Sequence, residues 1–232
     1  KKSKRITKKH LKRYRRPLPG YLQMDFKYVP YLINNKQYYQ LSCVDHHSSW
    51  RLIRQYPNKD LIAVEDFLLT LEDECPFPIV ELQTDNDTSF TDKFWTEKPG
   101  TISGMHVVDE WCAKNKIRHK LIPVGEKELN GKVENTHKQD DREFFSQINL
   151  IDFAELQEHS RRYEWHWNHL RKTKALNRLT PIETLWLAYV RVLAVTQYIA
   201  EKNQSPVQKI KKLSAIDRYL TWLEEDAKKY GT

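Results

Sequence analysis

The chain has 232 residues, of which 39% are hydrophobic and 30% are charged, and its formal net charge is +8. No apolar run approaches the roughly 20 residues that a helix needs to cross a bilayer, so the chain reads as soluble and globular, and a membrane function is not expected. The cysteines form no Cys-x-x-Cys pair, which argues against a disulfide framework or a cysteine zinc site and favours the reducing cytoplasm; they are Cys43, Cys75 and Cys112.

The positive charge is concentrated at the N-terminus. Residues 1–16 (KKSKRITKKHLKRYRR) contain ten Lys or Arg and no acid, so the remaining residues carry a net charge of −2. Such a basic arm attracts polyanions and makes binding to nucleic acid strongly dependent on salt. We therefore expect Arg13, Arg15 and Arg16 to contact DNA, the alternative being a solvated arm with no specific role.

Three candidate strands follow the Pro/Gly breaker at residues 16–20. They cover residues 21–30, 36–45 and 49–56, are rich in aromatic and β-branched side chains, and are separated by Asn-Asn and His-His-Ser turns. Short turns between consecutive strands predict an antiparallel meander.

Helices and strands then alternate. Apolar residues recur at helical spacing over residues 61–75, which predicts a helix whose buried face holds Leu61, Val64, Phe67, Leu68 and Leu71. A strand over 78–86, a helix over 105–116 and a strand over 117–123 follow, and this alternation indicates parallel strand pairing. Three meander strands followed by helix, strand, helix and strand is the order of a ribonuclease H-like domain, an α/β fold with a mixed five-stranded sheet flanked by helices.

From residue 129 onward the sequence is helical. The predicted helices cover residues 129–147, 151–170, 181–200 and 206–229, and Thr180 and Pro181 suit the N-cap and first turn of the third. The predicted organisation is a basic arm (1–16), a catalytic core (17–150), a helical post-core region (151–187) and a C-terminal helical extension (188–232).

Three acidic residues are the candidate catalytic groups. Asp25 lies within the first predicted strand, Asp85 at the carboxyl end of the fourth, and Glu134 one turn into the helix after the fifth. A carboxylate buried between Met24 and Phe26 is unfavourable without a cation or a donor, and loops at the carboxyl ends of strands are usual ligand sites in α/β sheets. Carboxylates that converge from separate elements can bracket a scissile phosphate with two metal ions.

Four segments resemble the signature regions of the retroviral-integrase superfamily, which includes many bacterial insertion-sequence transposases. Three of them, YLQMDFKYVP, LQTDNDTSF and LNGKVENTHKQ, contain Asp25, Asp85 and Glu134, and the fourth, residues 163–186, is similar to the region after the core. The resemblance implies a ribonuclease H-like DDE transposase or integrase with strand-transfer activity. It also implies that the three carboxylates hold two Mg²⁺ or Mn²⁺ ions in each active site, with no side chain acting as nucleophile.

The spacing of the acids departs from the family pattern. Between Asp85 and Glu134 lie 48 residues, more than is usual in the family, which predicts an insertion near residues 91–104. Glu126 and Glu128 are closer to the usual spacing and are rival third ligands.

Two further residues differ from many relatives. Asp87 stands where glycine is common, which predicts a changed turn beside Asp85. Asp141 lies on the helical face of Glu134, where relatives often have a basic residue, so DNA contact on that face is expected to be weaker.

Basic residues near the acids are the candidate DNA contacts. Two lysines flank the third acid and three cations follow the predicted core; they are Lys132, Lys138, Arg171, Lys172 and Lys174. We expect them to contact phosphate groups, the alternative being a solvated surface.

The leading hypothesis is a transposase or integrase that cleaves element ends and joins them to target DNA. Because two ends must be handled together, its expected partners are double-stranded DNA and further copies of itself, with the C-terminal amphipathic helices as interfaces. We expect it in the cytoplasm, associated with the nucleoid in a bacterium, and without a membrane partner. Two alternatives are a transposase-derived DNA-binding protein whose catalysis has lapsed and a ribonuclease H-like nuclease that cuts without joining.

Overall fold

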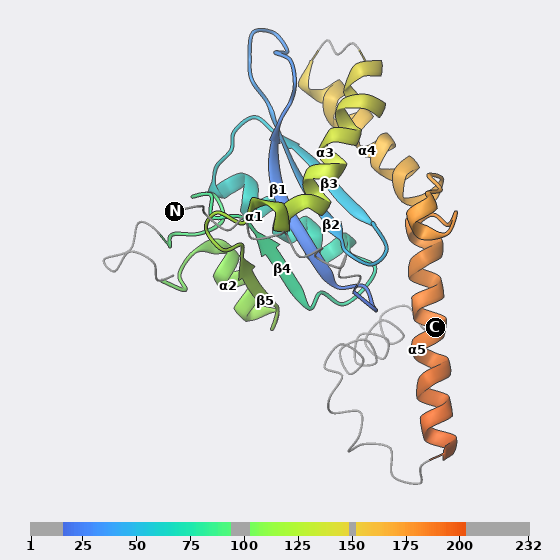
Figure 1. The fold of residues 1–232 in the computed structure, drawn as a ribbon. Helices are drawn as coiled ribbons and strands as arrows, with labels where there is room; N and C mark the ends of the chain where they lie inside the picture. Colours follow the sequence, from blue (N-terminus) through green and yellow to red (C-terminus); the bar gives the residue numbers. More distant parts are fainter. Residues whose placement is uncertain (1–15, 94–102, 149–151, 203–232) are drawn as a thin grey trace, which may run out of the picture.

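A computed structural model describes residues 16–93, 103–148 and 152–202 and contains a mixed five-stranded sheet (Figure 1). Its strands are β1 (Tyr21–Tyr28), β2 (Tyr39–Asp45), β3 (Arg51–Tyr56), β4 (Glu81–Thr84) and β5 (Arg118–Leu121), in the spatial order β3-β2-β1-β4-β5. The first three are antiparallel, whereas β4 pairs in parallel with β1 and β5. The predicted meander and the predicted parallel pairs are confirmed.

The β1–β2 connection turns where the sequence predicts. Asn34 and Asn35 both have positive φ (51° and 58°) and lie between the bridge partners Ile33 and Lys36. Asparagine tolerates this left-handed conformation better than most residues, which explains the pair at this turn.

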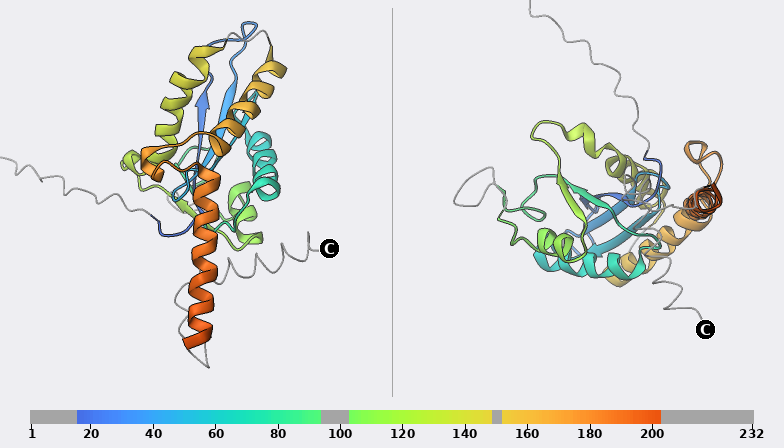
Figure 2. Two further views of the ribbon diagram at one scale, coloured as in Figure 1. Left: turned by 90° about the vertical axis from the view of Figure 1, so that its right-hand side faces the viewer. Right: turned by 90° about the horizontal axis from the view of Figure 1, so that it is seen from below.

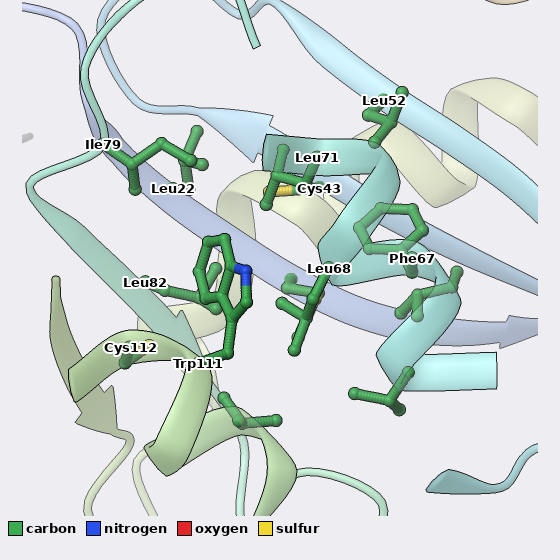
Figure 3. Close-up of a cluster of buried hydrophobic side chains, with 14 of the residues drawn as sticks. Leu22, Cys43, Leu52, Phe67, Leu68, Leu71, Ile79, Leu82, Trp111 and Cys112 are labelled. Carbon is green, nitrogen blue, oxygen red and sulfur yellow. The ribbon is translucent and has the colours of Figure 1, made fainter. Parts of the chain in front are cut away.

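The sheet has one apolar face because side chains alternate between the two faces along each strand. Two helices cover it, α1 (Leu61–Glu74) and α2 (Val107–Lys114). Figure 3 shows this cluster, in which strand side chains meet those of the helices; it includes Leu22, Cys43, Leu52, Leu82, Phe67, Leu68, Leu71 and Trp111. This is the main hydrophobic core.

The opposite face of the sheet is polar and is covered by α3 (Gly131–Glu143). Several strand side chains on this face contact α3 or the turn that precedes it; they are Gln23, Asp25, Lys27, Gln40, Arg51 and Gln83. The candidate catalytic residues therefore lie in a polar layer rather than in the hydrophobic core.

A fourth helix, α4 (Phe153–His169), covers the outer edge of β3. The side-chain amide of Asn168 accepts a hydrogen bond from the Arg51 backbone N–H (3.0 Å) and donates to the Arg51 carbonyl (2.8 Å). The Glu164 carboxylate accepts from the Ile53 backbone N–H. The exposed hydrogen-bonding groups of an edge strand are in this way satisfied by helix side chains.

Two details of the predicted helices are wrong. Leu61 is 50% exposed rather than buried, because the buried face of α1 is formed by Ala63, Val64, Phe67, Leu68 and Leu71. The helix predicted over 129–147 is shorter, since the residues on both sides of α3 form 3₁₀ turns, Lys127–Asn130 and Phe145–Gln147. Helix ends often tighten in this way.

The last described helix, α5 (Pro181–Lys202), extends beyond the sheet (Figure 2). It begins with the predicted cap, in which Thr180 Oγ1 accepts from the Glu183 N–H (3.1 Å) and Glu183 Oε2 accepts from the Thr180 N–H (2.8 Å). Three apolar side chains at helical spacing are exposed on it, namely Trp186, Val190 and Leu193.

Several predictions lie outside the described residues. These are the basic arm up to residue 15, most of the predicted insertion (94–102) and the predicted helix over 206–229. The predicted domain boundaries stay predictions. Within the described ranges, no helix has the length and apolar character that a membrane span requires.

Candidate active site

Asp25 and Asp85 occupy equivalent positions on neighbouring strands. β1 and β4 pair in parallel with Gln23 opposite Gln83, and each aspartate lies two residues further along its own strand direction. Because side chains on one face recur at every second residue, this register brings both carboxylates to the polar face.

The surroundings of Asp25 raise the pKa of its carboxyl group to about 7. Burial is the largest cause, the negative charge of Asp85 is the next, and the charge of Glu134 adds to both. A hydrogen bond from the Phe26 backbone and the ammonium group of Lys59 act in the opposite direction. The charges of both other candidate catalytic residues therefore contribute to the raised pKa of Asp25.

Glu134 approaches this point from the first turn of α3. It is the glutamate whose charge raises the pKa of Asp25. The rivals Glu126 and Glu128 are exposed and belong to the turn that precedes α3. The arrangement therefore favours Glu134 over either rival as the third member of the group.

A divalent cation fits the chemistry of these three side chains. Carboxylates supply the hard oxygen ligands that Mg²⁺ and Mn²⁺ prefer, and burial together with the charges of Asp85 and Glu134 raises the pKa of Asp25. Within residues 16–93, 103–148 and 152–202, no three His, Cys, Asp or Glu side chains form a group that could hold a metal ion as they stand. Like charges repel one another, and a bound cation would offset that repulsion.

Asp87 stabilises the loop that carries Asp85. Its backbone N–H donates to Asp85 Oδ1 (2.9 Å), and its carboxylate accepts from the Ser89 N–H (2.9 Å) and from Lys59 Nζ (2.6 Å). Burial raises the pKa of Asp87, but the hydrogen bonds from Lys59 and Ser89 outweigh burial and the pKa lies below its usual value. Lys59 is thus a cation beside the acids, and no sequence pattern pointed to it.

His137 also lies beside Asp25, one turn after Glu134 on α3. Its Nδ1 is 4.0 Å from Asp25 Oδ2, and its Nε2 is buried without a hydrogen-bond partner among the described residues. Burial lowers the pKa of His137 to about 4, so the ring is neutral near pH 7. The three-residue spacing from Glu134, which places both on one helix face, is the signal that could have identified it.

A buried ion pair holds α3 on the sheet. Arg51 Nη1 donates to Asp140 Oδ1 (2.6 Å), and neither side chain is exposed to solvent. Gln40 donates to the other Asp140 oxygen (2.8 Å), and the guanidinium group lies over the rings of Tyr163 and Trp167. This pair fixes the distance between the sheet and the helix that carries the third acid.

Some predicted DNA contacts are available to a ligand. Lys138 and Lys174 are exposed, and neither has an ion-pair partner in the part of the chain that the structure describes. Arg16, by contrast, already forms an ion pair with Glu81 (3.3 Å). The other two arm residues, Arg13 and Arg15, lie outside the described residues.

Three further predicted DNA contacts already have protein partners. The pairs are Lys132 Nζ with Ser49 Oγ (2.6 Å), Arg171 with Glu143 (2.6 and 2.9 Å) and Lys172 with Glu183 (3.7 Å). A phosphate contact by any of these residues would have to share or replace its present partner.

A cavity of about 330 Å³ lies where the N-terminal segment, the turn after β2 and α5 meet. It is lined by Arg16, His47 and Arg191 among others, and by no acidic side chain. Arg191 is exposed on α5. This cavity adds Arg191, which no sequence pattern singled out, to the candidates for phosphate contact.

Residues 18–127 match the family model of the integrase core domain, a range that includes Asp25 and Asp85. The "Putative integrase ORF3" of Spiroplasma virus SpV1-C74 is 27% identical over 190 residues, which cover 79% of this chain and 52% of that protein. The chain thus spans about half the length of this relative.

Solved integrase structures are similar in fold. The HTLV-2 integrase catalytic core domain in complex with magnesium has a TM-score of 0.51 and 18% identity, over 72% of this chain and 97% of that chain. The catalytic core domain of BIV integrase has a TM-score of 0.52 and 16% identity, over 73% of this chain and 95% of that chain. A chain of the simian T-cell lymphotropic virus intasome has a TM-score of 0.55 and 18% identity, over 74% of this chain and 56% of that chain. The sheet and its helices are therefore ribonuclease H-like, and residues 18–127 are similar in sequence to the integrase core domain.

Proposed function

We propose that this chain is the catalytic core of a DDE transposase or integrase, which cleaves the ends of a DNA element and joins them to target DNA. The observation that carries the proposal is the register of β1 and β4, which places Asp25 and Asp85 at equivalent positions on neighbouring strands, with Glu134 in the first turn of the helix that covers the same face. Acids that repel one another in a polar layer are suited to a cationic ligand, and phosphoryl transfer by two metal ions requires such ligands.

In this proposal Asp25, Asp85 and Glu134 hold Mg²⁺ or Mn²⁺, with two ions in each active site. Magnesium is supported by the HTLV-2 core domain, whose structure was determined in complex with that ion. When bound, the ions supply the positive charge that activates an attacking oxygen of water or of a DNA 3′ end and that stabilises the leaving oxygen.

The remaining side chains orient the acids and the DNA. The Asp87–Lys59 pair holds the loop of Asp85 in place. A neutral His137 adds no positive charge that would compete with a cation at Asp25. The exposed Lys138 lies one turn after Glu134, where its ammonium group can contact a phosphate.

The proposed partners are double-stranded DNA and further copies of the chain. Exposed basic residues and the basic arm would bind the phosphate backbone of element ends and target. The exposed apolar side chains of Trp186, Val190 and Leu193 on α5 support a homo-oligomer, since such a stripe is suited to packing against a second helix.

A strand-transfer assay tests the proposal. The chain would be incubated with Mg²⁺ or Mn²⁺, a plasmid target and labelled duplexes that carry the genomic DNA flanking its gene on each side. We expect 3′-end cleavage and joined product. Asp25→Asn, Asp85→Asn and Glu134→Gln should each abolish both steps while DNA binding persists. Full activity in any one variant would remove that residue from the site.

The rival glutamates provide matched controls. Glu126→Gln and Glu128→Gln remove a carboxylate close in sequence to Glu134 and should leave activity unchanged. Loss of activity in either variant would instead assign it as the third ligand. Cleavage without joining would indicate a nuclease, and DNA binding without either reaction would indicate a protein whose catalysis has lapsed.

A further inference from the structure

Two glutamines accompany the two aspartates on the polar face of the sheet. Gln23 lies opposite Gln83 in the β1–β4 register, and each precedes its aspartate by two residues, as QMD and QTD. Both are buried, with 1% and 5% of their surface exposed. The period of two along a strand places each glutamine on the same face as its aspartate. The pair therefore forms the row of side chains next to the carboxylates.

Both glutamines bind the backbone at the start of α3. Gln23 Nε2 and Gln83 Nε2 donate to the same carbonyl oxygen, that of Leu129, at 2.6 and 2.9 Å. Gln23 Oε1 accepts from the backbone N–H groups of Lys132 and Val133, at 3.1 Å each. Four hydrogen bonds thus connect two strand side chains to residues 129–133, and Glu134 is the next residue.

These contacts replace a cap that the side chain of the N-cap residue does not make. The first N–H groups of a helix have no partner within the helix and are usually satisfied by the side chain of the N-cap residue. The N-cap of α3 is Asn130, and its side chain makes no capping hydrogen bond. Gln23 satisfies two of these N–H groups from a strand instead. The position of the first helical turn is therefore set by β1.

We propose that Gln23 and Gln83 are positioning residues, which clamp the start of α3 so that Glu134 stays beside Asp25 and Asp85. The inference rests on the proposed function, because it assumes that the three carboxylates act together. Like charges repel one another, and the clamp would hold Glu134 beside the strands against this repulsion. Groups that do not bind the metal themselves but orient its ligands commonly affect the affinity for the metal.

Hydrogen exchange tests the clamp without any activity measurement. Gln23→Met keeps the length and approximate volume of the side chain but removes three of the four hydrogen bonds. We expect the Lys132 and Val133 amides to exchange about tenfold faster in this variant. Gln83→Met removes the fourth hydrogen bond and should accelerate exchange by a smaller factor. If Gln23→Met does not fold, the exchange rates of Gln83→Met provide the test. Unchanged exchange in both variants would refute the clamp.

A matched control comes from Asn168, a buried side-chain amide that also joins a helix to a strand backbone through two hydrogen bonds. Asn168→Leu should lower the thermal stability without changing exchange at Lys132 and Val133. This variant separates a general loss of stability from release of the start of α3.

Magnesium titration tests whether the clamp serves the carboxylates. The readout is the rise in melting temperature of the whole chain as Mg²⁺ alone is added. Gln23→Met should raise the Mg²⁺ concentration for half-maximal stabilisation about tenfold, Gln83→Met less, and Asn168→Leu not at all. Faster exchange with an unchanged Mg²⁺ midpoint would show a merely structural role and overturn the proposal.

Failure of the proposed function would look different. A wild-type chain that binds Mg²⁺ with the expected dependence on Gln23, but joins no DNA, would refute strand transfer and leave the clamp intact. A wild-type chain that Mg²⁺ does not stabilise would refute both.

Discussion

Arg51 of β3 and Asp140 of α3 form an ion pair from which solvent is wholly excluded. Arg51 Nε and Nη2 have no hydrogen-bond partner among the described residues, while the centre of the guanidinium group lies 3.7 Å from the ring centroid of Trp167. The aromatic ring faces a cation whose remaining donors are otherwise unsatisfied. Such a pair contributes less to net stability than its short distance suggests, but it specifies where the helix lies.

Breaking this pair from one side should be strongly destabilising. We predict that Asp140→Asn lowers the free energy of unfolding by about 3 kcal/mol, because Arg51 is left as an uncompensated buried charge. Urea denaturation measures the change. Arg162→Gln, which breaks the exposed ion pair with Glu158, is the control and should have little effect. Equal decreases in the free energy of unfolding in the two variants would contradict the prediction that the buried ion pair matters more than the exposed one.

Removing a charge from the acidic site should stabilise the protein when no metal is present. Burial and the charges of Asp85 and Glu134 disfavour the ionised Asp25 carboxylate. We predict that Asp25→Asn raises the free energy of unfolding by about 1 kcal/mol at pH 8 in EDTA and abolishes stabilisation by Mg²⁺. Thermal unfolding with and without Mg²⁺ measures both effects. Asp73→Asn, at an exposed position on α1, should change neither.

Glu164 should make stability depend on pH. Burial raises its pKa from 4.5 to about 7, although Arg54 and the Ile53 N–H act in the opposite direction. Between these values the folded chain retains a proton that the unfolded chain has released, so stability falls as pH rises from 4.5 to 7. We predict that in Glu164→Gln the free energy of unfolding decreases by about 2 kcal/mol less between pH 4.5 and 7 than in the wild type, as measured by denaturation at several pH values. Glu158→Gln, exposed on the same helix, should leave the slope unchanged.

Exposed basic residues should contribute to DNA binding through phosphate contacts. We predict that Lys138→Gln and Arg191→Gln each weaken binding to duplexes of any sequence and reduce the slope of log K against log salt by about 0.9. Fluorescence anisotropy at several salt concentrations measures the slope. The control is Arg162→Gln, because that arginine already pairs with Glu158. An unchanged slope in both test variants would remove these residues from the DNA-binding surface.

The basic arm should dominate the salt dependence. Residues 1–16 carry ten Lys or Arg and no acid. We predict that their deletion lowers DNA affinity and flattens the salt dependence more than any single substitution, because several phosphate contacts are lost together. The same anisotropy titration checks this. A truncated chain with an unchanged salt slope would show that the arm stays in solvent.

The order of the strands along the chain could be predicted because it rests on short-range patterns, and the candidate acids could be named from their place in those elements and from the resemblance of their segments to integrases. Aromatic and β-branched runs separated by turn residues identify β1, β2 and β3, and alternation with helices identifies the parallel strands. The exposure of Leu61 could not be predicted, since several adjacent apolar residues in α1 fit more than one helical face. Which of them faces the sheet depends on how the helix is docked.

The surroundings of the acids were less accessible. Lys59 and Asp140 act through partners distant in sequence, so no local pattern reports them. The repeated Gln-x-Asp of β1 and β4 is visible in the sequence, but its meaning depends on the register that places Gln23 opposite Gln83. Sequence patterns identify the charged residues, whereas only the folded structure shows which other residues hold the charged side chains in place.

The capping of α3 from β1 also has a consequence for the order in which the molecule forms. Gln23 and Leu129 are 106 residues apart, so their contact closes a long loop, and we expect it to form after the more local contacts of the sheet. A nascent or partly unfolded chain would therefore lack an ordered glutamate beside its aspartates. If the proposed function holds, only a molecule with a completed sheet would acquire an active centre.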